Sequence, residues 1–387
     1  MTRVAVALLA VGLWAPFASG APAAGRCGGR LLRAPAGLPA PVAMTTECGR
    51  FRIGRDGRIT HSPKRLPVPR GASWYPADGA WYRPENGHLV IGRWRQRLWR
   101  SQGRFTPAYD VGALTLGPHA LAFSYGNSTR LYVADLDSAE HEVADGEYPL
   151  GWTRAGDLFT RADRRGELRL RHAAGGLAGT LATRVSDYAF DRANAELDFV
   201  ESGRVLRTDG SAPVAFAHVG RLGLSRRPEL DPLGRLLALR DRRRIVVLRR
   251  DGSVFASTEL PRRRSRVDGV SSPLVASPDG RSVAFTLTRG NTAYGSRGSE
   301  MVYLLRTGMR QAMRLHTERM RFAVCERGAD LAWHGRWLLY SASEGNVIVL
   351  DGRGGRRTLD LTRTVLSLPG SHGGEGHANV TASWARY

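Results

Sequence analysis

A turn followed at once by a strand, clearest in residues 277–286, recurs along this chain and limits what the chain can fold into. Pro278 presets φ for the second position of a β-turn, and Asp279 and Gly280 accept the turn positions that follow. The run 283–285, Val-Ala-Phe, then continues as a short apolar strand. Weaker copies of this unit predict a chain built from β repeats.

Two interleaved series of turns carry the repeat. The inner-hairpin turns are spaced roughly 30 to 55 residues apart, a range that brackets propeller blades. They are Asn86-Gly87, Pro118-His119, Ala155-Gly156, Ala193-Asn194, Leu233-Gly234, Asp279-Gly280 and Gly335-Arg336. The outer-hairpin turns, where the hairpin-favouring dipeptide Asp-Gly recurs, are Asp56-Gly57, Gln102-Gly103, Asp137-Ser138, Gly175-Gly176, Asp209-Gly210, Asp251-Gly252, Thr307-Gly308 and Asp351-Gly352. Two hairpins per unit make four antiparallel strands.

The pattern therefore predicts an all-β fold, a β-propeller of four-stranded blades. Seven units hold both hairpins, while residues 51–60 supply an outer hairpin alone and residues 379–385 a lone strand. If these two fragments share one sheet, they form an eighth, composite blade; if the first hairpin only caps the ring, seven blades remain. We expect seven blades, with six or eight as the alternatives.

One blade carries a family resemblance. Residues 277–285, Ser-Pro-Asp-Gly-Arg-Ser-Val-Ala-Phe, resemble the repeat of TolB-type propellers, also called the WD-like repeat. Residues 231–239 are similar, with Asp231 in place of Ser and Leu233 in place of the turn Asp. The resemblance implies a propeller that binds proteins or ligands at the ends of its central channel. It implies no reaction, because propellers carry many functions.

The N-terminus has the layout of a secretory signal peptide. Arg3 precedes an apolar run over residues 4–17, and small residues follow. The run is too short for a membrane span. We therefore expect a signal peptide over residues 1–23, an irregular arm over 24–49 and the propeller over 50–387. The mature chain is expected to lack a transmembrane segment and to be secreted, periplasmic or on the cell surface.

Three cysteines fit an exported chain with one disulfide and one free thiol. Cys27 with Cys48 is the simplest pair, because it closes a leader rich in Pro, Gly and Ala. Cys48 with Cys325 is the alternative if the two ends of the chain meet.

The formal net charge is +22, which would ordinarily indicate an anionic partner. However, Lys64 is the only lysine among 57 basic residues, and the arginines are spread along the whole chain. We therefore expect no nucleic acid partner. Binding of an anionic wall polymer by arginines remains an alternative.

Binding residues are expected on one rim loop and in one aromatic cluster. The insertion 289–298 extends a loop of the sixth unit, and rim loops held by rigid strands commonly carry binding, so Tyr294 and Arg297 are candidates. Trp94 and Trp99 lie among arginines and are suited to stacking on a sugar or base. Packing between blades is the alternative role for these rings, and we favour it.

The sequence offers less evidence for a catalytic or metal site than for a binding surface. The nucleophile elbow G-x-S-x-G is absent. His372, Glu375 and His377 are the best candidates for a metal site, but their glycine-rich surroundings favour a connection without preset geometry. We expect no cofactor.

These observations favour a monomeric exported propeller that acts as a protein- or ligand-binding module, or scaffold, at the cell envelope, with a protein or an envelope polymer as partner. Two alternatives remain open. One is an extracytoplasmic hydrolase or lyase with its site at the channel mouth. The other is the arginine-rich binder of an anionic wall polymer.

Overall fold

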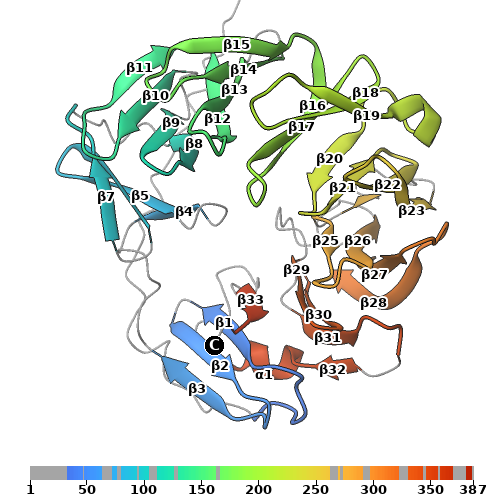
Figure 1. Cartoon of the computed structure of the whole chain (residues 1–387). Helices are drawn as coiled ribbons and strands as arrows, with labels where there is room; N and C mark the ends of the chain where they lie inside the picture. The colour runs from blue at the N-terminus through green and yellow to red at the C-terminus, as the bar shows by residue number, and fades with distance from the viewer. Residues whose placement is uncertain are drawn as a thin grey trace, which may run out of the picture.

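The computed structural model describes most of the chain after residue 32. The described residues are 33–46, 48–62, 72–75, 80–93, 96–103, 111–125, 130–162, 166–261, 269–270, 273–290, 297–321, 330–342, 346–355, 358–368 and 381–385. In them, 33 strands form eight antiparallel sheets, arranged as blades around a central axis (Figure 1). The chain is an all-β propeller, as the turn pattern predicts.

The blades are numbered in the order of the chain. Within each blade, the strands are given from the innermost to the outermost. Blade 1 is β4–β7 (Ser73–Tyr75, Ala80–Glu85, His88–Arg93, Gln96–Arg100); blade 2 is β8–β11 (Val111–Leu116, Ala120–Tyr125, Leu131–Asp135, His141–Ala144). Blade 3 is β12–β15 (Glu147–Trp152, Leu158–Ala162, Glu167–Arg171, Leu177–Ala182); blade 4 is β16–β19 (Val185–Asp191, Glu196–Glu201, Arg204–Thr208, Val214–His218).

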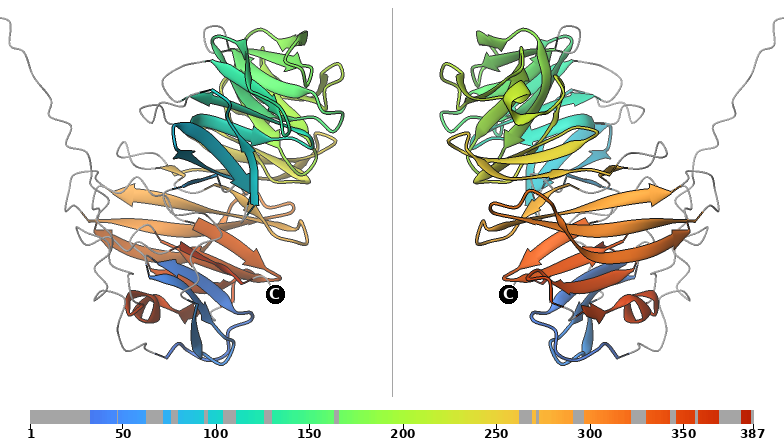
Figure 2. Two further views of the ribbon diagram at one scale, coloured as in Figure 1. Left: turned by 90° about the vertical axis from the view of Figure 1, so that its left-hand side faces the viewer. Right: turned by 90° about the vertical axis from the view of Figure 1, so that its right-hand side faces the viewer.

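Blade 5 is β20–β23 (Glu229–Pro232, Leu236–Arg240, Arg244–Arg249, Val254–Glu259). Blade 6 is β24–β28 (Gly269–Val270, Val275–Ala276, Ser282–Gly290, Arg297–Arg306, Met313–Arg321), where the short β24 and β25 both pair with β26. Blade 7 is β29–β32 (Asp330–His334, Trp337–Ser341, Val347–Asp351, Thr358–Asp360). In the side views, the long strands of blade 6 extend well across the molecule (Figure 2).

Blade 8 is composite and makes the count eight instead of the expected seven. Its inner strand is the C-terminal β33 (Thr381–Trp384), followed outward by β1 (Val42–Thr46), β2 (Gly49–Ile53) and β3 (Ile59–Ser62). β33 pairs with β1 from Val42 opposite Trp384 to Thr45 opposite Thr381. Eight blades lie within the predicted range, and the two terminal fragments share one sheet because that pairing covers the inner edge of β1.

The segment predicted as an irregular arm is partly wrong. Val42 and Met44 are fully buried and alternate with the partly buried Ala43 and Thr45, so β1 lies inside residues 24–49. The preceding residues also pack: Leu38 is 1% exposed, and the Ala34 amide donates to the Gly57 carbonyl at 3.1 Å. The prolines in this stretch disfavour a helix but do not prevent a short strand with a period of two.

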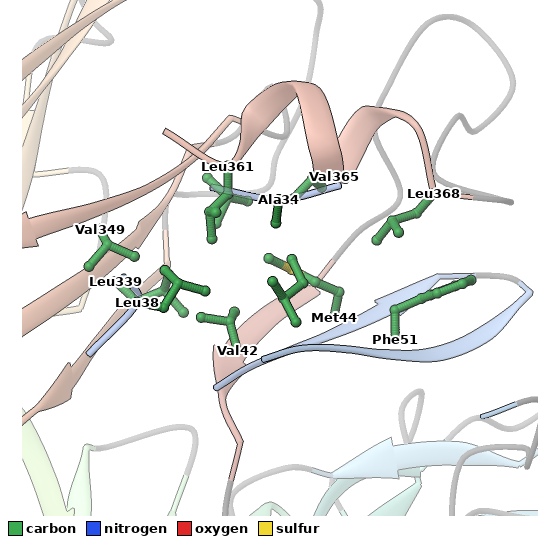
Figure 3. Close-up of a cluster of buried hydrophobic side chains, with 12 residues drawn as sticks. Ala34, Leu38, Val42, Met44, Phe51, Leu339, Val349, Leu361, Val365 and Leu368 are labelled. Carbon is green, nitrogen blue, oxygen red and sulfur yellow. The ribbon is translucent and has the colours of Figure 1, made fainter. Parts of the chain in front are cut away.

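Residues of blades 7 and 8 share one hydrophobic cluster (Figure 3). The short helix α1 (Thr362–Leu366) and the residue before it contribute the buried Val365 and Leu361, which face Val42 and Met44 of β1. Comparable clusters lie at the other interfaces between consecutive blades from 1 to 7. Hydrophobic burial between sheets therefore holds the blades together.

The predicted turn series match the structure in blades 2 to 7. In blade 1, however, each predicted turn lies one strand further along the blade than expected. Asn86-Gly87 joins β5 to β6, the second and third strands, and Gln102-Gly103 follows the outer strand β7. Asn86 and Gly87 have φ of 50° and 77°, the left-handed values of a tight hairpin turn. The dipeptide predicted a turn correctly but did not show which pair of strands it joins.

Tryptophans join inner strands of neighbouring blades. In three cases the indole N–H donates to a backbone carbonyl of the preceding blade: Trp152 to Thr115 at 3.4 Å, Trp333 to Val275 at 3.1 Å, and Trp384 to Ala332 at 2.9 Å. These rings occupy the space between blades, where large aromatic side chains fill the gap. No helix in the described part of the chain is long and apolar enough to cross a membrane.

We predict that Trp152→Ala lowers the free energy of unfolding by about 3–5 kcal/mol, because the side chain is 6% exposed and leaves a cavity between blades 2 and 3. Trp152→Phe keeps most of the ring volume and loses the indole hydrogen bond, costing about 1 kcal/mol from that bond. Urea unfolding followed by circular dichroism measures both. Val254→Ala, at a side chain 48% exposed, is the control and should change stability by less than about 0.5 kcal/mol. Equal stabilities of Trp152→Ala and the control would contradict the packing role.

Candidate functional site

A cavity of about 640 Å³ lies where blade 7 meets blade 8. Its described lining is Gly37, Leu38, Pro39, Arg55, His334, Gly335, Arg336 and Trp337. We call it the seam pocket. These residues come from the segment before β1, the β2–β3 turn and the β29–β30 turn. Its volume is in the range of small-ligand sites.

Blade 8 positions Arg55 through the segment that precedes β1. The Gly37 amide donates to the Arg55 carbonyl at 2.8 Å, and Arg55 Nε donates to the Leu38 carbonyl at 3.4 Å. Leu38 is itself anchored in the core between blades 7 and 8. Arg55 is therefore exposed to solvent but rises from a backbone that is held in place.

Blade 7 positions Arg336 through a tight turn. Gly335 has φ of 54°, a left-handed value that glycine adopts at little cost. The Arg336 guanidinium lies 4.8 Å from the centroid of the Trp337 ring, a cation–π distance. Its Nε is 3.9 Å from Asp351, while the Arg336 side chain remains 44% exposed. This long ion pair leaves N–H groups of the guanidinium directed at solvent.

His334 connects the pocket to the closing strand. Its ring is exposed and lies 5.4 Å from the Trp384 ring of β33, tilted by 42°. Trp384 in turn donates to the Ala332 carbonyl of β29, in the strand that contains His334. One wall of the pocket therefore touches the strand that closes the ring.

The pocket is electropositive and partly apolar. Its described lining holds two arginines and one histidine and includes no carboxylate, while Leu38, Pro39 and Trp337 supply apolar surface. Arginine presents a planar fork of N–H donors that fits carboxylate and phosphate oxygens. The arrangement is therefore suited to binding an anion.

Of the four residues predicted as binding residues, the two that the structure describes, Trp99 and Arg297, are not among the described lining of this pocket. Trp94 and Tyr294 lie outside the described residues. Arg297 is the first residue of β27 in blade 6, opposite Arg321. Trp99 is 3% exposed and donates its indole N–H to the Ser138 carbonyl of blade 2 at 2.9 Å. The structure thus places Trp99 in the packing between blades.

The other predicted sites involve parts of the chain that are not described. His372, Glu375 and His377 lie outside the described residues, as do Cys27 and Cys325. The Cys27–Cys48 disulfide therefore stays a prediction, and so does its alternative. Among the residues that are described, no group of three or more His, Cys, Asp and Glu side chains is placed to hold a metal ion.

Sequence reasoning missed a group of carboxylates on the inner strands of blades 4 and 5. Asp187 of β16 accepts a hydrogen bond from the Leu230 amide at 2.7 Å. Glu229 of β20 pairs with Arg240 at 2.9 Å, and Asp231 lies 3.1 Å from Arg240 Nε, as an ion pair without hydrogen-bond alignment. Because these residues are far apart in sequence, only the pairing of the two blades reveals the group.

The pKa of Asp187 is raised above its ordinary value by burial, and the negative charges of Glu229 and Asp231 add to this. Burial also raises the pKa of Asp231, which Arg240 partly opposes. A raised carboxyl pKa is common at catalytic sites. Here each of the three carboxylates has a protein partner, so we interpret the group as a link between blades 4 and 5.

A second buried carboxylate stabilises blade 3. Glu147 is 1% exposed and accepts hydrogen bonds from Arg171 at 2.7 and 2.8 Å, from Arg169 at 2.5 Å and from Thr160 at 2.8 Å. Burial opposes its ionisation, but these donors together hold the pKa of Glu147 below its ordinary value. The carboxylate is fully engaged in joining strands of one blade.

Similarity to known proteins is found among solved structures only. No protein-family profile matches the sequence, and no curated protein sequence is significantly similar to it. Among solved structures, Hsv2 of Kluyveromyces lactis is 10% identical with a TM-score of 0.46, covering 81% of this chain and 97% of its own. AztD of Citrobacter koseri is 11% identical with a TM-score of 0.47, covering 89% and 97%. An inactive variant of virginiamycin B lyase from Staphylococcus aureus, in a structure with quinupristin, is 16% identical with a TM-score of 0.37, covering 67% and 96%.

We predict that Asp187→Asn becomes more stable relative to the wild type as the pH rises from about 4 to 7. The folded-state pKa of Asp187 is raised, so the stability contributed by its protonated form is present at low pH and is lost as the pH rises through that pKa. Asparagine stays neutral and keeps a carbonyl oxygen for the Leu230 amide. Urea unfolding of both proteins at several pH values measures the difference. A difference that is constant with pH, or that has the opposite sign, would show that burial does not dominate at Asp187.

Proposed function

We propose that this protein is an exported β-propeller that acts as a binding module at the cell envelope. The observation that carries the proposal is the seam pocket: a cavity of ligand size in which rigid strands and turns from two blades hold basic and aromatic side chains. Rigid scaffolds that present side chains from loops are a common design for binding sites. The signal-peptide pattern of the first 23 residues supports the export, and the resemblance of residues 277–285 to TolB-type repeats supports a binding role.

The chemistry of the pocket favours an anionic partner, which makes an anionic wall polymer the second candidate. Arg55 and Arg336 belong to neighbouring blades yet line one cavity, and the net charge of +22 attracts anions to the whole surface. The net charge of the whole surface attracts anions of any kind and does not distinguish between them. The seam pocket adds a fixed position at which an anionic group and an apolar neighbour are bound together.

We predict that Arg55→Gln/Arg336→Gln weakens binding to isolated, protein-free cell walls by about 10-fold or more. Hydrogen bonds to charged groups contribute about 1.5–3 kcal/mol each, and this variant removes two donors of that kind. Sedimentation of the purified full chain with the walls, at about 50 and 200 mM salt, gives the affinity and its salt dependence. The same preparation incubated with soluble envelope proteins tests a protein partner.

A charge-matched variant separates the pocket from the general charge. Arg235 and Arg281 are exposed and lie in the inner turns of blades 5 and 6, which correspond to the blade 7 turn that carries Arg336. Arg235→Gln/Arg281→Gln removes the same charge from exposed turns outside the seam pocket and should bind nearly as the wild type does. Equal losses in the two variants, for walls and for envelope proteins alike, would rule out the seam pocket as the binding site.

We also predict that deleting residues 2–23 keeps the protein in the cytoplasm of a bacterial host, whereas the full chain is exported and shortened by about 20 residues. The apolar run of residues 4–17 is the part that export machinery would require. Cell fractionation and mass spectrometry of the purified chain measure both outcomes. Identical location and N-terminus in the two proteins would contradict export.

A further inference from the structure

The seam pocket bridges the two blades at which the chain closes on itself. Arg55 belongs to blade 8, whose strands come from both ends of the chain, and Arg336 belongs to blade 7. The two sides of the pocket are therefore about 280 residues apart in sequence. They meet where blade 8, completed by the pairing of β33 with β1, packs against blade 7. A ligand that contacts both arginines holds these two blades against each other.

The donors define the chemical class of such a ligand. Each guanidinium can present a fork of N–H groups, and the two forks reach the pocket from different blades. An oxyanion with several oxygens, as in phosphate or a polycarboxylate, can accept from both forks at once. The apolar surface of Leu38, Pro39 and Trp337 then favours an oxyanion attached to a carbon skeleton.

A short series of contacts leads from the pocket to the closing strand. His334 lines the pocket and touches the Trp384 ring at 5.4 Å. Trp384 lies opposite Val42 in the ladder between β33 and β1, and the adjacent Ala385 amide donates to the Pro41 carbonyl at 2.9 Å. β33 contributes only four residues to the sheet, so small gains in contact there have a measurable effect on local opening.

We infer that the seam pocket binds an oxyanion that bridges Arg55 and Arg336, and that its binding stabilises the closure of the ring by β33. The inference rests on the proposed function, because it concerns the same pocket. It goes further in naming the class of ligand and in coupling ligand binding to the pairing of the two chain ends.

Hydrogen–deuterium exchange of the purified full chain tests this inference. The probes are inorganic phosphate and citrate, each added at constant ionic strength made up with potassium chloride. At a probe concentration about ten times its Kd, linkage predicts up to about ten-fold slower exchange of amides in β33 and β1. Peptides from β17 of blade 4 serve as the internal reference and should not change.

Two variants test whether the protection depends on the arginines of the pocket. In Arg55→Gln/Arg336→Gln the probes should no longer slow exchange in β33 and β1, whereas Arg235→Gln/Arg281→Gln should behave as the wild type does. Protection by phosphate alone supports a tetrahedral phosphate group as the ligand, and protection by citrate alone supports carboxylates. Equal slowing in β17 and β33 would show a general ion effect and would overturn the inference.

Failure of the inference can be told apart from failure of the proposed function. If isothermal titration shows that a probe binds in an arginine-dependent way while β33 exchanges as before, the coupling to ring closure is overturned and the binding function stands. If neither probe binds the wild type, the oxyanion ligand is overturned, and the proposed function is then judged by the wall and protein binding assays alone.

Discussion

The pairing of β33 with β1 is the interaction on which the rest of the ring depends. A propeller blade is stabilised by its two neighbours, and an open ring would leave two blade faces and one inner strand edge in water. Four residues at the end of the chain cover that edge. Their pairing also brings the N-terminal segment against blade 7, where Ala34 and Leu38 join the hydrophobic cluster of both blades. Ring closure and the construction of the seam pocket are thus one structural event.

Carboxylates and arginines are used differently inside the blades and on the surface. In blades 3, 4 and 5 a largely buried acid pairs with an arginine of the same sheet: Glu147 with Arg171, Asp198 with Arg207 and Asp231 with Arg240. Such pairs replace hydration that the groups lose on burial, so they preserve the fold more than they strengthen it. Because arginines outnumber acids, many remain on the surface. Arg55 and Arg336 differ from the others in this surplus because the backbone on either side of one cavity holds them.

The fold was largely predictable because its signals are local. A turn dipeptide followed by an apolar strand depends on neighbouring residues only, and it located the hairpins of blades 2 to 7 correctly. Where the local signal was ambiguous, the prediction failed: Asn86-Gly87 is a good hairpin turn whichever strands it joins, so blade 1 was shifted by one strand. β1 was not predicted because the prolines near residues 35–41 indicate irregular structure, whereas the alternation that marks the strand involves only Val42 and Met44.

The candidate site was not predictable for the opposite reason. Its lining combines residues 37–39, 55 and 334–337, and no pattern within any one of these segments indicates a partner in the others. Trp99 shows the same limit, since an aromatic residue among arginines suits either a binding surface or packing between blades. The cover provided by the neighbouring blade supports packing, the role that the sequence favoured.

The position of the pocket also bears on how a ring of this kind can respond to a ligand. In blades 1 to 5 and 7 the inner strand pairs with a strand that follows it directly in the sequence, whereas β33 pairs with β1, from the other part of the chain. A binding site elsewhere on the rim would add stability to blades that the chain already ties together. At the seam of blades 7 and 8, the same binding energy acts on a pairing between strands that no hairpin connects, so a ligand there acts directly on the closure of the ring.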